Sequence, residues 1–292
     1  MTSTSLDISG MLEAELLEVI QQLISVCESH AIDFILVGAT ARDIHFLCVD
    51  EETPGRGIAD ADFAFLVPSW DAFEEIIAEI TRDGKNSRDV KRPSRIRSAA
   101  GIILDLIPFG DIEAPEGKIS WPQNPDHVVS TIGYRDAFDS AQLWRVQGDA
   151  SRGVRIASIP GLAVLNLIAW EDTYPNGSTD AIDFRFLLEN YDAGQIDRLF
   201  SQEENLLDEG NTEYELAVAR LLGRDVGRIL SAGTRQHVLA LLEGERAVDG
   251  PLRLVNDLLV DSVQNAEFVL AQLGHFQQGI LDTTKDSTVA AQ

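Results

Sequence analysis

The chain has 292 residues, of which 45% are hydrophobic, and its formal net charge at pH 7 is −25. This composition supplies a core for one large or two small domains and excludes a chain that is disordered throughout. The negative charge disfavours bulk binding to DNA, RNA or anionic membranes, because their phosphate groups would be repelled. Only two cysteines are present, Cys27 and Cys48, which excludes a disulfide framework and a four-cysteine zinc site.

The amino-terminal segment has neither the basic nor the apolar region of a signal peptide. The longest apolar stretch, residues 161–170, is much shorter than the ~20 residues that span a bilayer. We therefore expect a cytoplasmic protein without a membrane anchor.

Hydrophobic spacing predicts an α/β first part. Helices are expected at 11–29, 39–47 and 71–80, the last capped by Ser69, and strands at 33–37, 58–67, 101–108, 142–147 and 153–157. The later part reads as helical, at 160–172, 179–191, 212–231, 233–243 and 251–279. The predicted domains are a core at 1–157, a helical domain at 158–282 and a flexible tail at 283–292.

The pair Asp60 and Asp62 stands in an otherwise apolar predicted strand. Side chains two apart in a strand point to the same face, so two carboxylates would lie close together and repel each other. A divalent cation relieves this repulsion, and hard oxygen ligands suit Mg²⁺ or Mn²⁺. The alternative for a bare pair of this kind is the solvated face of an edge strand.

Two neighbouring features favour the metal interpretation. Gly38, Ala39 and Thr40 form a strand-to-helix turn, where backbone N–H groups can approach a phosphate, and Arg42 could add a positive charge. Asp105 is a lone acid in another apolar strand, which is costly unless the carboxylate has a partner or a task. Three carboxylates on two neighbouring strands, beside a glycine turn, predict a metal-dependent phosphoryl-transfer site. Asp60 and Asp62 would hold cations, and Asp105 would either bind a cation as well or accept the proton of the attacking hydroxyl.

The segment 82–97 is strongly basic, with seven basic and two acidic residues in an acidic chain. Its arginines, among them Arg95, could bind a triphosphate, an RNA end or an acidic partner. A solvated, mobile hairpin is an equally weighted alternative.

The chain resembles the nucleotidyltransferase superfamily of the polymerase-β-like group, and more narrowly the AbiEii/AbiGii-type toxin family. The segments that carry the resemblance include VGATARDIHF (37–46), RGIADADFAFLVPSWDAFEEI (56–76) and ILDLIPFGDIE (103–113). The resemblance implies a mixed sheet with flanking helices, an α+β or α/β nucleotidyltransferase fold, followed by an all-α domain. It also implies that Gly38–Thr40 is the phosphate-side turn, that Asp60 and Asp62 bind metal, and that Asp105 is the third acid.

The chain departs from the family pattern at two lysine positions. The family motif LKLIAW is LNLIAW at 165–170 of this chain, so Asn166 stands where the family has a lysine that is expected to contact the triphosphate. The family motif KDAxD is TDAID at 179–183, so Thr179 stands where the family has a second lysine. Asn can donate a hydrogen bond but carries no charge. Arg56 or Arg95 could supply the missing charge, and Asp183 could orient a basic partner or a substrate group.

The predicted activity is Mg²⁺- or Mn²⁺-dependent transfer of a nucleoside monophosphate from an NTP to a hydroxyl. The acceptor could be an RNA end such as that of tRNA, a protein or a small molecule, and the resemblance favours a toxin with a cognate antitoxin. One rival is a degenerate NTP- or metal-binding module, favoured by Asn166. Another is an acidic protein-interaction partner that mimics nucleic acid.

Overall fold

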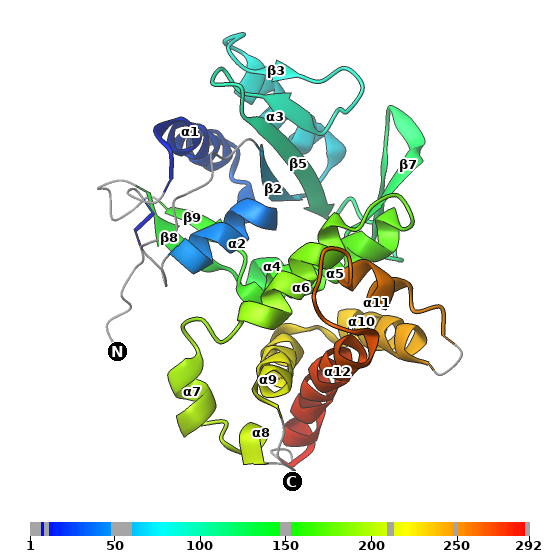
Figure 1. Ribbon diagram of the computed structural model, residues 1–292. Coiled ribbons are helices and arrows are strands. Elements are labelled where there is room, and N and C mark those ends of the chain that lie inside the picture. The colour runs from blue at the N-terminus through cyan, green and yellow to red at the C-terminus, as the bar shows by residue number, and fades with distance from the viewer. Residues whose placement is uncertain are drawn as a thin grey trace. The chain divides into compact units, whose positions relative to one another are not determined.

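The structure is a computed structural model that describes residues 7–8, 12–47, 60–146, 153–208, 213–247 and 250–289, with side chains as far as residue 283. It divides into two compact units, Met1–Ser158 and Ile159–Gln292 (Figure 1). The expected fold class is confirmed: a mixed sheet with flanking helices is followed by a region in which the described elements are all helices.

A seven-stranded mixed sheet organises the first unit, in the order β3-β4-β5-β2-β1-β9-β8. The strands β5 and β2 are parallel, as are β1 and β9, and the other neighbouring pairs are antiparallel. The strand bounds are β1 Asp33–Val37, β2 Asp60–Val67, β3 Ser87–Arg88, β4 Arg95–Arg97, β5 Ile103–Gly110, β8 Gln142–Arg145 and β9 Gly153–Ile156.

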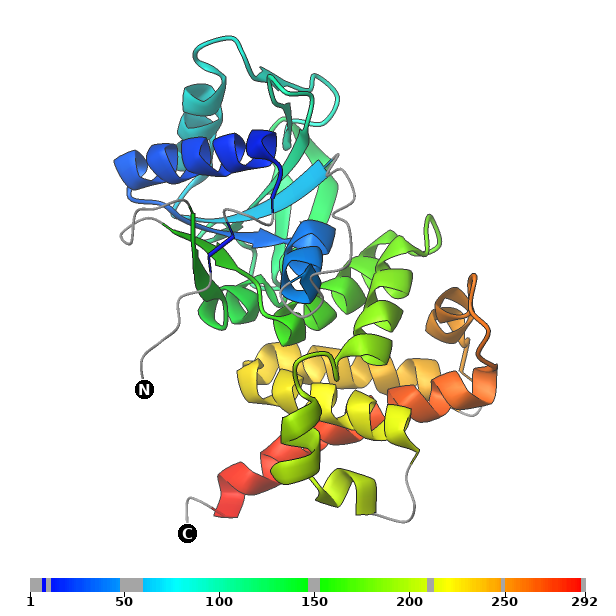
Figure 2. The same ribbon diagram turned by 60° about the vertical axis from the view of Figure 1, so that its left-hand side comes forward.

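Helices α1 (Ala14–His30) and α3 (Trp70–Thr81) cover one face of this sheet (Figures 1 and 2). Alternate residues of β2 point into this layer, and the ring of Phe65 lies 6.2 Å from that of Phe73 on α3. The predicted cap of α3 is confirmed, because Ser69 Oγ accepts a hydrogen bond from the Ala72 N–H at 3.1 Å.

The opposite face carries the acidic residues. Helix α2 (Gly38–Leu47) follows β1 without an intervening loop, and α4 (Tyr134–Asp139) packs at the end of β5, where Phe109 and Phe138 have ring centroids 6.0 Å apart. Because Phe109 lies four residues after Asp105, both side chains leave β5 on this face.

Sequence patterning gives no strand bounds for several short elements, although a hairpin is one of the two alternatives for the basic segment. The hairpin of β6 (Lys118–Trp121) and β7 (Asn124–Ser130) is largely polar, and β7 is mostly exposed. Strands β3 and β4 lie within the basic segment, where Ile96 is the buried apolar residue between two arginines of β4. Such strands bury too few side chains to give a clear alternating pattern.

The second unit consists of packed helices, with α9 and α12 lying against each other (Figure 2). The helix bounds are α5 Ile159–Thr173, α6 Thr179–Asn190, α7 Ile196–Ser201, α8 Asn205–Asp208, α9 Tyr214–Ile229, α10 Ala232–Arg246, α11 Arg253–Leu258 and α12 Ala266–Val289. Among the described helices, none is long and apolar enough to cross a membrane.

The single helix expected at 251–279 is wrong. The structure has two helices there, because Asp261 adopts a left-handed conformation with φ of 53° and Asn265 caps the next helix by accepting from the Phe268 N–H at 2.9 Å. Helix α12 also continues to Val289, beyond the end predicted at residue 279.

Candidate active site

The acidic residues of β2 and β5 lie on one face of the sheet. In the parallel register of these strands, Asp62 is directly opposite Asp105, and Asp60 is opposite Ile103. Side chains at matched positions of neighbouring strands point the same way, and Asp60, two residues before Asp62, leaves β2 on the same face as Asp62. The sequence predicts that Asp105 joins the two acids of β2, and the register of β2 and β5 places Asp105 directly opposite Asp62 in one row.

Arg95 extends this row onto a third strand. It pairs with Asp105 in the antiparallel register of β4 and β5, and its guanidinium donates from Nε to Oδ1 at 2.8 Å and from Nη2 to Oδ2 at 2.5 Å. Both side chains are one-quarter exposed. The hydrogen bonds to Asp105 raise the pKa of Arg95, and the charge of Asp62 contributes in the same direction. Asp62, Asp105 and Arg95 therefore lie side by side across β2, β5 and β4. Asp60, Asp62 and Asp105 together are called the acid row.

Gly38 borders the acid row on its other side. Val37, at the end of β1, pairs with Asp62, and the chain then enters α2 through Gly38 with φ of +68°. A Cβ at Gly38 would lie 2.3 Å from Asp62 Oδ2, so the Asp62 carboxylate packs directly against the glycine backbone. The turn thus needs glycine for its backbone conformation and for the room that Asp62 takes.

Replacing Gly38 by alanine should therefore destabilise the protein more than the same change at Gly84. Both glycines have positive φ, but a Cβ at Gly84 would meet nothing within 4 Å. The conformational cost is shared, so the difference measures the contact with Asp62, and we expect about 1–2 kcal/mol. Urea unfolding followed by circular dichroism gives both values. Equal losses for the two variants would contradict the close packing of Asp62.

The first turn of α2 holds the remaining residues of the predicted phosphate turn. Thr40 is buried and its hydroxyl donates to the backbone carbonyl of Asp60 at 3.0 Å, which fixes the helix to the start of β2. Ala39 lies beside it in the same turn and is exposed. Arg42 contacts the neighbouring Asp43, with Nε 2.9 Å from Oδ1. Thr40 therefore positions α2 against the strand that carries the acids.

The basic segment 82–97 forms the β3–β4 hairpin at the edge of the sheet. Arg88 forms a bidentate ion pair with Glu74 of α3, at 2.5 and 2.9 Å, and also donates to the Pro93 carbonyl at 2.7 Å. Arg88 thus ties the hairpin to α3, whereas Arg95 on the partner strand faces the acid row.

The acid row fits a divalent cation only in part. Asp60 and Asp62 offer carboxylate oxygens from one strand, but both oxygens of Asp105 accept hydrogen bonds from Arg95. Within the part of the chain that the structure describes, no three His, Cys, Asp or Glu side chains are grouped closely enough to hold a metal ion. The residues therefore fit a cation that takes two protein carboxylates and draws its other ligands from substrate phosphates and water.

The sequence also predicts that Arg56, Asn166 and Asp183 bind the nucleotide. Arg56 falls outside the described residues. Asn166 on α5 and Asp183 on α6 belong to the second unit, each on a half-buried position of its helix. Burial raises the pKa of Asp180 and the charge of Asp183 raises it further, so acidic groups gather at the start of α6.

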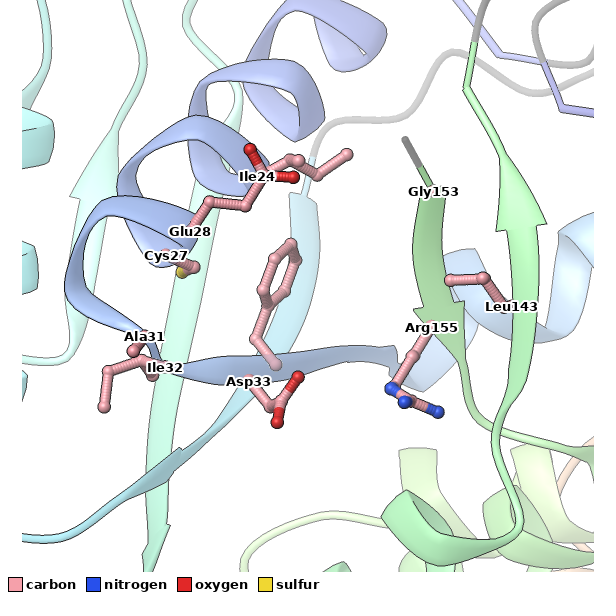
Figure 3. Close-up of a pocket in the computed structure, with 10 residues that line it drawn as sticks. Ile24, Cys27, Glu28, Ala31, Ile32, Asp33, Leu143, Gly153 and Arg155 are labelled. Atoms are coloured by element: carbon pink, nitrogen blue, oxygen red, sulfur yellow. The ribbon is translucent and has the colours of Figure 1, made fainter. Parts of the chain in front are cut away.

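A pocket of about 420 Å³ opens at the other end of β1 (Figure 3). Strand β1 pairs with β9 at Ile35, opposite Arg155, and at Leu36, opposite Ile156. The pocket lies beside the preceding residues of β1. Its lining includes Glu28 of α1 and Asp33 of β1. Burial, with a contribution from Asp33, raises the pKa of the Cys27 thiol there to about 12, so this thiol is unreactive at neutral pH. Sequence reasoning did not single out this pocket, whose lining is dispersed over four elements.

No family model matches the sequence, and no curated protein matches it. Among solved structures, the chain is similar to the antibiotic-resistance factor ANT(2'')-Ia, at 15% identity and a TM-score of 0.36, over 68% of this chain and 97% of that one. It is also similar to an antigenic nucleotidyltransferase-like protein from Paracoccidioides brasiliensis, at 15% identity and a TM-score of 0.37, over 71% and 91% of the two chains. A third is the Thermotoga maritima CCA-adding enzyme complexed with tRNA, at 12% identity and a TM-score of 0.25, over 93% and 82%. These TM-scores are all below 0.5, so the case for a function rests on the chain's own residues.

Proposed function

We propose that the chain is a cytoplasmic, metal-dependent nucleotidyltransferase that transfers a nucleoside monophosphate from an NTP to a hydroxyl group. The observation that carries this proposal is the row of Asp62, Asp105 and Arg95 across three adjacent strands, beside the turn at Gly38. Carboxylates for a cation, a guanidinium for phosphate and a helix N-terminus at a glycine are the groups that transfer from a triphosphate requires.

In this proposal Asp60 and Asp62 hold the cation that accompanies the NTP. A bound Mg²⁺ or Mn²⁺ neutralises phosphate charge and polarises the bond between the phosphoryl groups. The N–H groups at the start of α2 face the phosphate chain, with Gly38 allowing the close approach. Asp105 accepts the proton of the attacking hydroxyl as the new oxygen–phosphorus bond forms, and pyrophosphate leaves as the bond to the α-phosphorus breaks. Asn166, Asp183 and Arg56 are proposed to contact the nucleotide, as the resemblance implies.

The acceptor is proposed to be an RNA end such as that of tRNA, a protein side chain or a small molecule. The resemblance to the AbiEii/AbiGii-type family motivates the further proposal of a toxin that is neutralised by an antitoxin. A regulator gene next to the coding sequence, whose product relieves growth arrest on co-expression, is the expected finding. Growth that is unaffected by expression of the chain alone would remove the toxin role.

Asp62→Asn should abolish most of the transfer. The variant keeps the size of the side chain but removes one metal-binding charge, so we expect label transfer from radioactive NTPs with Mg²⁺ to fall by about 100-fold. Asp126→Asn, at an exposed acid on β7, is the matched control and should transfer like the wild type. Equal transfer by the wild type and Asp62→Asn would overturn the proposed reaction.

A second candidate is a module of the same fold that binds NTP or metal without transfer. It is favoured by Asn166 and Thr179, which stand where the family has lysines, and by the engagement of Asp105 with Arg95. Calorimetric binding of NTP by the wild type, together with no label transfer to RNA, protein or small-molecule acceptors, is the result that supports this candidate.

A further inference from the structure

The Arg95–Asp105 pair uses every carboxylate oxygen that Asp105 has. The fork of the guanidinium donates to both oxygens, at 2.8 and 2.5 Å, and the two residues are directly opposite in the register of β4 and β5. Such a bidentate pair is among the stronger side-chain interactions and has a defined geometry. The guanidinium charge opposes a cation at Asp105, and its hydrogen bonds compete with a substrate hydroxyl for this carboxylate, so release of Arg95 would strengthen both interactions.

Arg95 also sets the charge of the row. Asp62 and Asp105 lie at matched positions of parallel strands, where two carboxylates facing each other are destabilising. The positive charge of Arg95, next along the row, offsets that repulsion and feels the charge of Asp62 as well. Arg95 thus performs part of the electrostatic task that a bound cation would perform.

Arg88, in the same hairpin, also forms a bidentate ion pair, and the role of this second pair is structural. Arg88 donates to Glu74 and also to the Pro93 carbonyl, so its release would break a contact within the hairpin backbone. By contrast, Arg95 donates both of its side-chain hydrogen bonds within the described chain to Asp105. Arg95 can therefore change partner while the hairpin stays in place.

We propose that Arg95 is an exchangeable positioning residue: it occupies Asp105 in the free protein and transfers to the polyphosphate of an incoming nucleotide, which releases Asp105. This inference rests on the proposed function of the same site. A guanidinium binds carboxylate and phosphate with the same two-pronged geometry, and a polyphosphate offers more negative charge than one carboxylate. The free protein is thereby kept from binding cations tightly, and the acid row becomes available together with the nucleotide.

The exchange predicts that one substitution changes the affinity for Mn²⁺ and the affinity for ATP in opposite directions. In Arg95→Gln the acid row loses its positive charge, so the affinity for Mn²⁺ alone, measured by the loss of the free-ion signal in electron paramagnetic resonance, should rise about tenfold. The affinity for ATP without metal, measured by calorimetry, should fall about tenfold, because the guanidinium that would bind its phosphates is gone. Arg88→Gln, in the same hairpin, should leave both affinities within about twofold.

Asp105→Asn provides a second variant for the case in which Arg95→Gln does not fold. An amide cannot hold the guanidinium as a carboxylate does, so Arg95 is released and ATP affinity without metal should rise severalfold. A fall or no change would overturn the exchange. The same holds if Arg95→Gln binds Mn²⁺ like the wild type, if it binds ATP like the wild type, or if the wild type does not bind ATP at all.

These measurements separate the inference from the proposed reaction. Opposite shifts in Mn²⁺ and ATP affinity, with no label transfer by the wild type, would keep Arg95 as an exchangeable ligand of a binding module and discard the transferase. Label transfer that is lost in Asp62→Asn, with affinities unaffected by Arg95→Gln, would keep the transferase and discard the exchange.

Discussion

Replacing Asp225 by asparagine is expected to lower the free energy of unfolding by about 3 kcal/mol. Asp225, on α9, is buried and accepts hydrogen bonds from Tyr191 Oη at 2.5 Å and from two nitrogens of Arg198 at 2.6 and 2.7 Å. It also pairs with Arg228. Removing one member of a buried ion pair typically costs about 3–5 kcal/mol, and the lower end applies here because Glu203 remains as a partner of both arginines.

The effect of Asp225→Asn should shrink in acid. Burial raises the pKa of Asp225, but hydrogen bonds from Arg198 and Tyr191 lower it, and the net shift is downward. A carboxyl with a lowered pKa in the folded state contributes stability that is present above its unfolded pKa of about 4 and is lost as the pH falls through the folded value. Glu203 and Asp282 shift in the same net direction, so the wild type should itself lose stability below about pH 5.

Urea unfolding at pH 7 and at about pH 3, below the unfolded pKa of Asp225, measures both effects when it is followed by circular dichroism. Asp139→Asn is the matched control, because its ion pair with Arg135 at 2.9 Å is mostly exposed and should contribute less than about 0.5 kcal/mol. If Asp225→Asn cost no more than Asp139→Asn at pH 7, the buried cluster would not be a source of stability.

The elements that sequence reasoning predicted well have strong local signals. The strand Asp33–Val37 has a continuous apolar run at residues 34–37 that ends at glycine, and helix α3 has Ser69 as its cap before an amphipathic pattern. The sequence does not predict the split of residues 251–279 into α11 and α12. The break depends on a left-handed conformation of Asp261, and for a residue other than glycine this conformation is set by tertiary packing.

For the candidate site, sequence could supply the residues but not their partners. The spacing of Asp60 and Asp62 fixes their common face once the segment is a strand. The facing of Asp62 and Asp105 depends on the register of two strands separated by a helix and a hairpin, and that register is set by packing. For the same reason the sequence named Arg95 as a phosphate ligand without indicating that Asp105 already holds it.

A second large effect is expected for Gly223→Ala in the packing of α9 against α12. A Cβ at Gly223 would lie 2.0 Å from the carbonyl oxygen of Phe276 and 3.1 Å from Gly279 Cα. Both neighbours are backbone atoms, so the strain cannot be relieved by a rotamer change and the two helices would have to separate. We expect a loss of at least about 3 kcal/mol in the free energy of unfolding, which exceeds the usual cost of overpacking a core.

The same substitution at Gly244 should have the opposite sign. Gly244 lies in α10, where a Cβ would meet nothing within 4 Å, so alanine adds helix propensity of about 0.5–1 kcal/mol without a clash. Thermal unfolding of the two variants should therefore show a lower midpoint for Gly223→Ala and a higher one for Gly244→Ala than for the wild type. Similar shifts for both would mean that α9 and α12 do not approach at Gly223, since intrinsic propensity treats the two helical glycines alike.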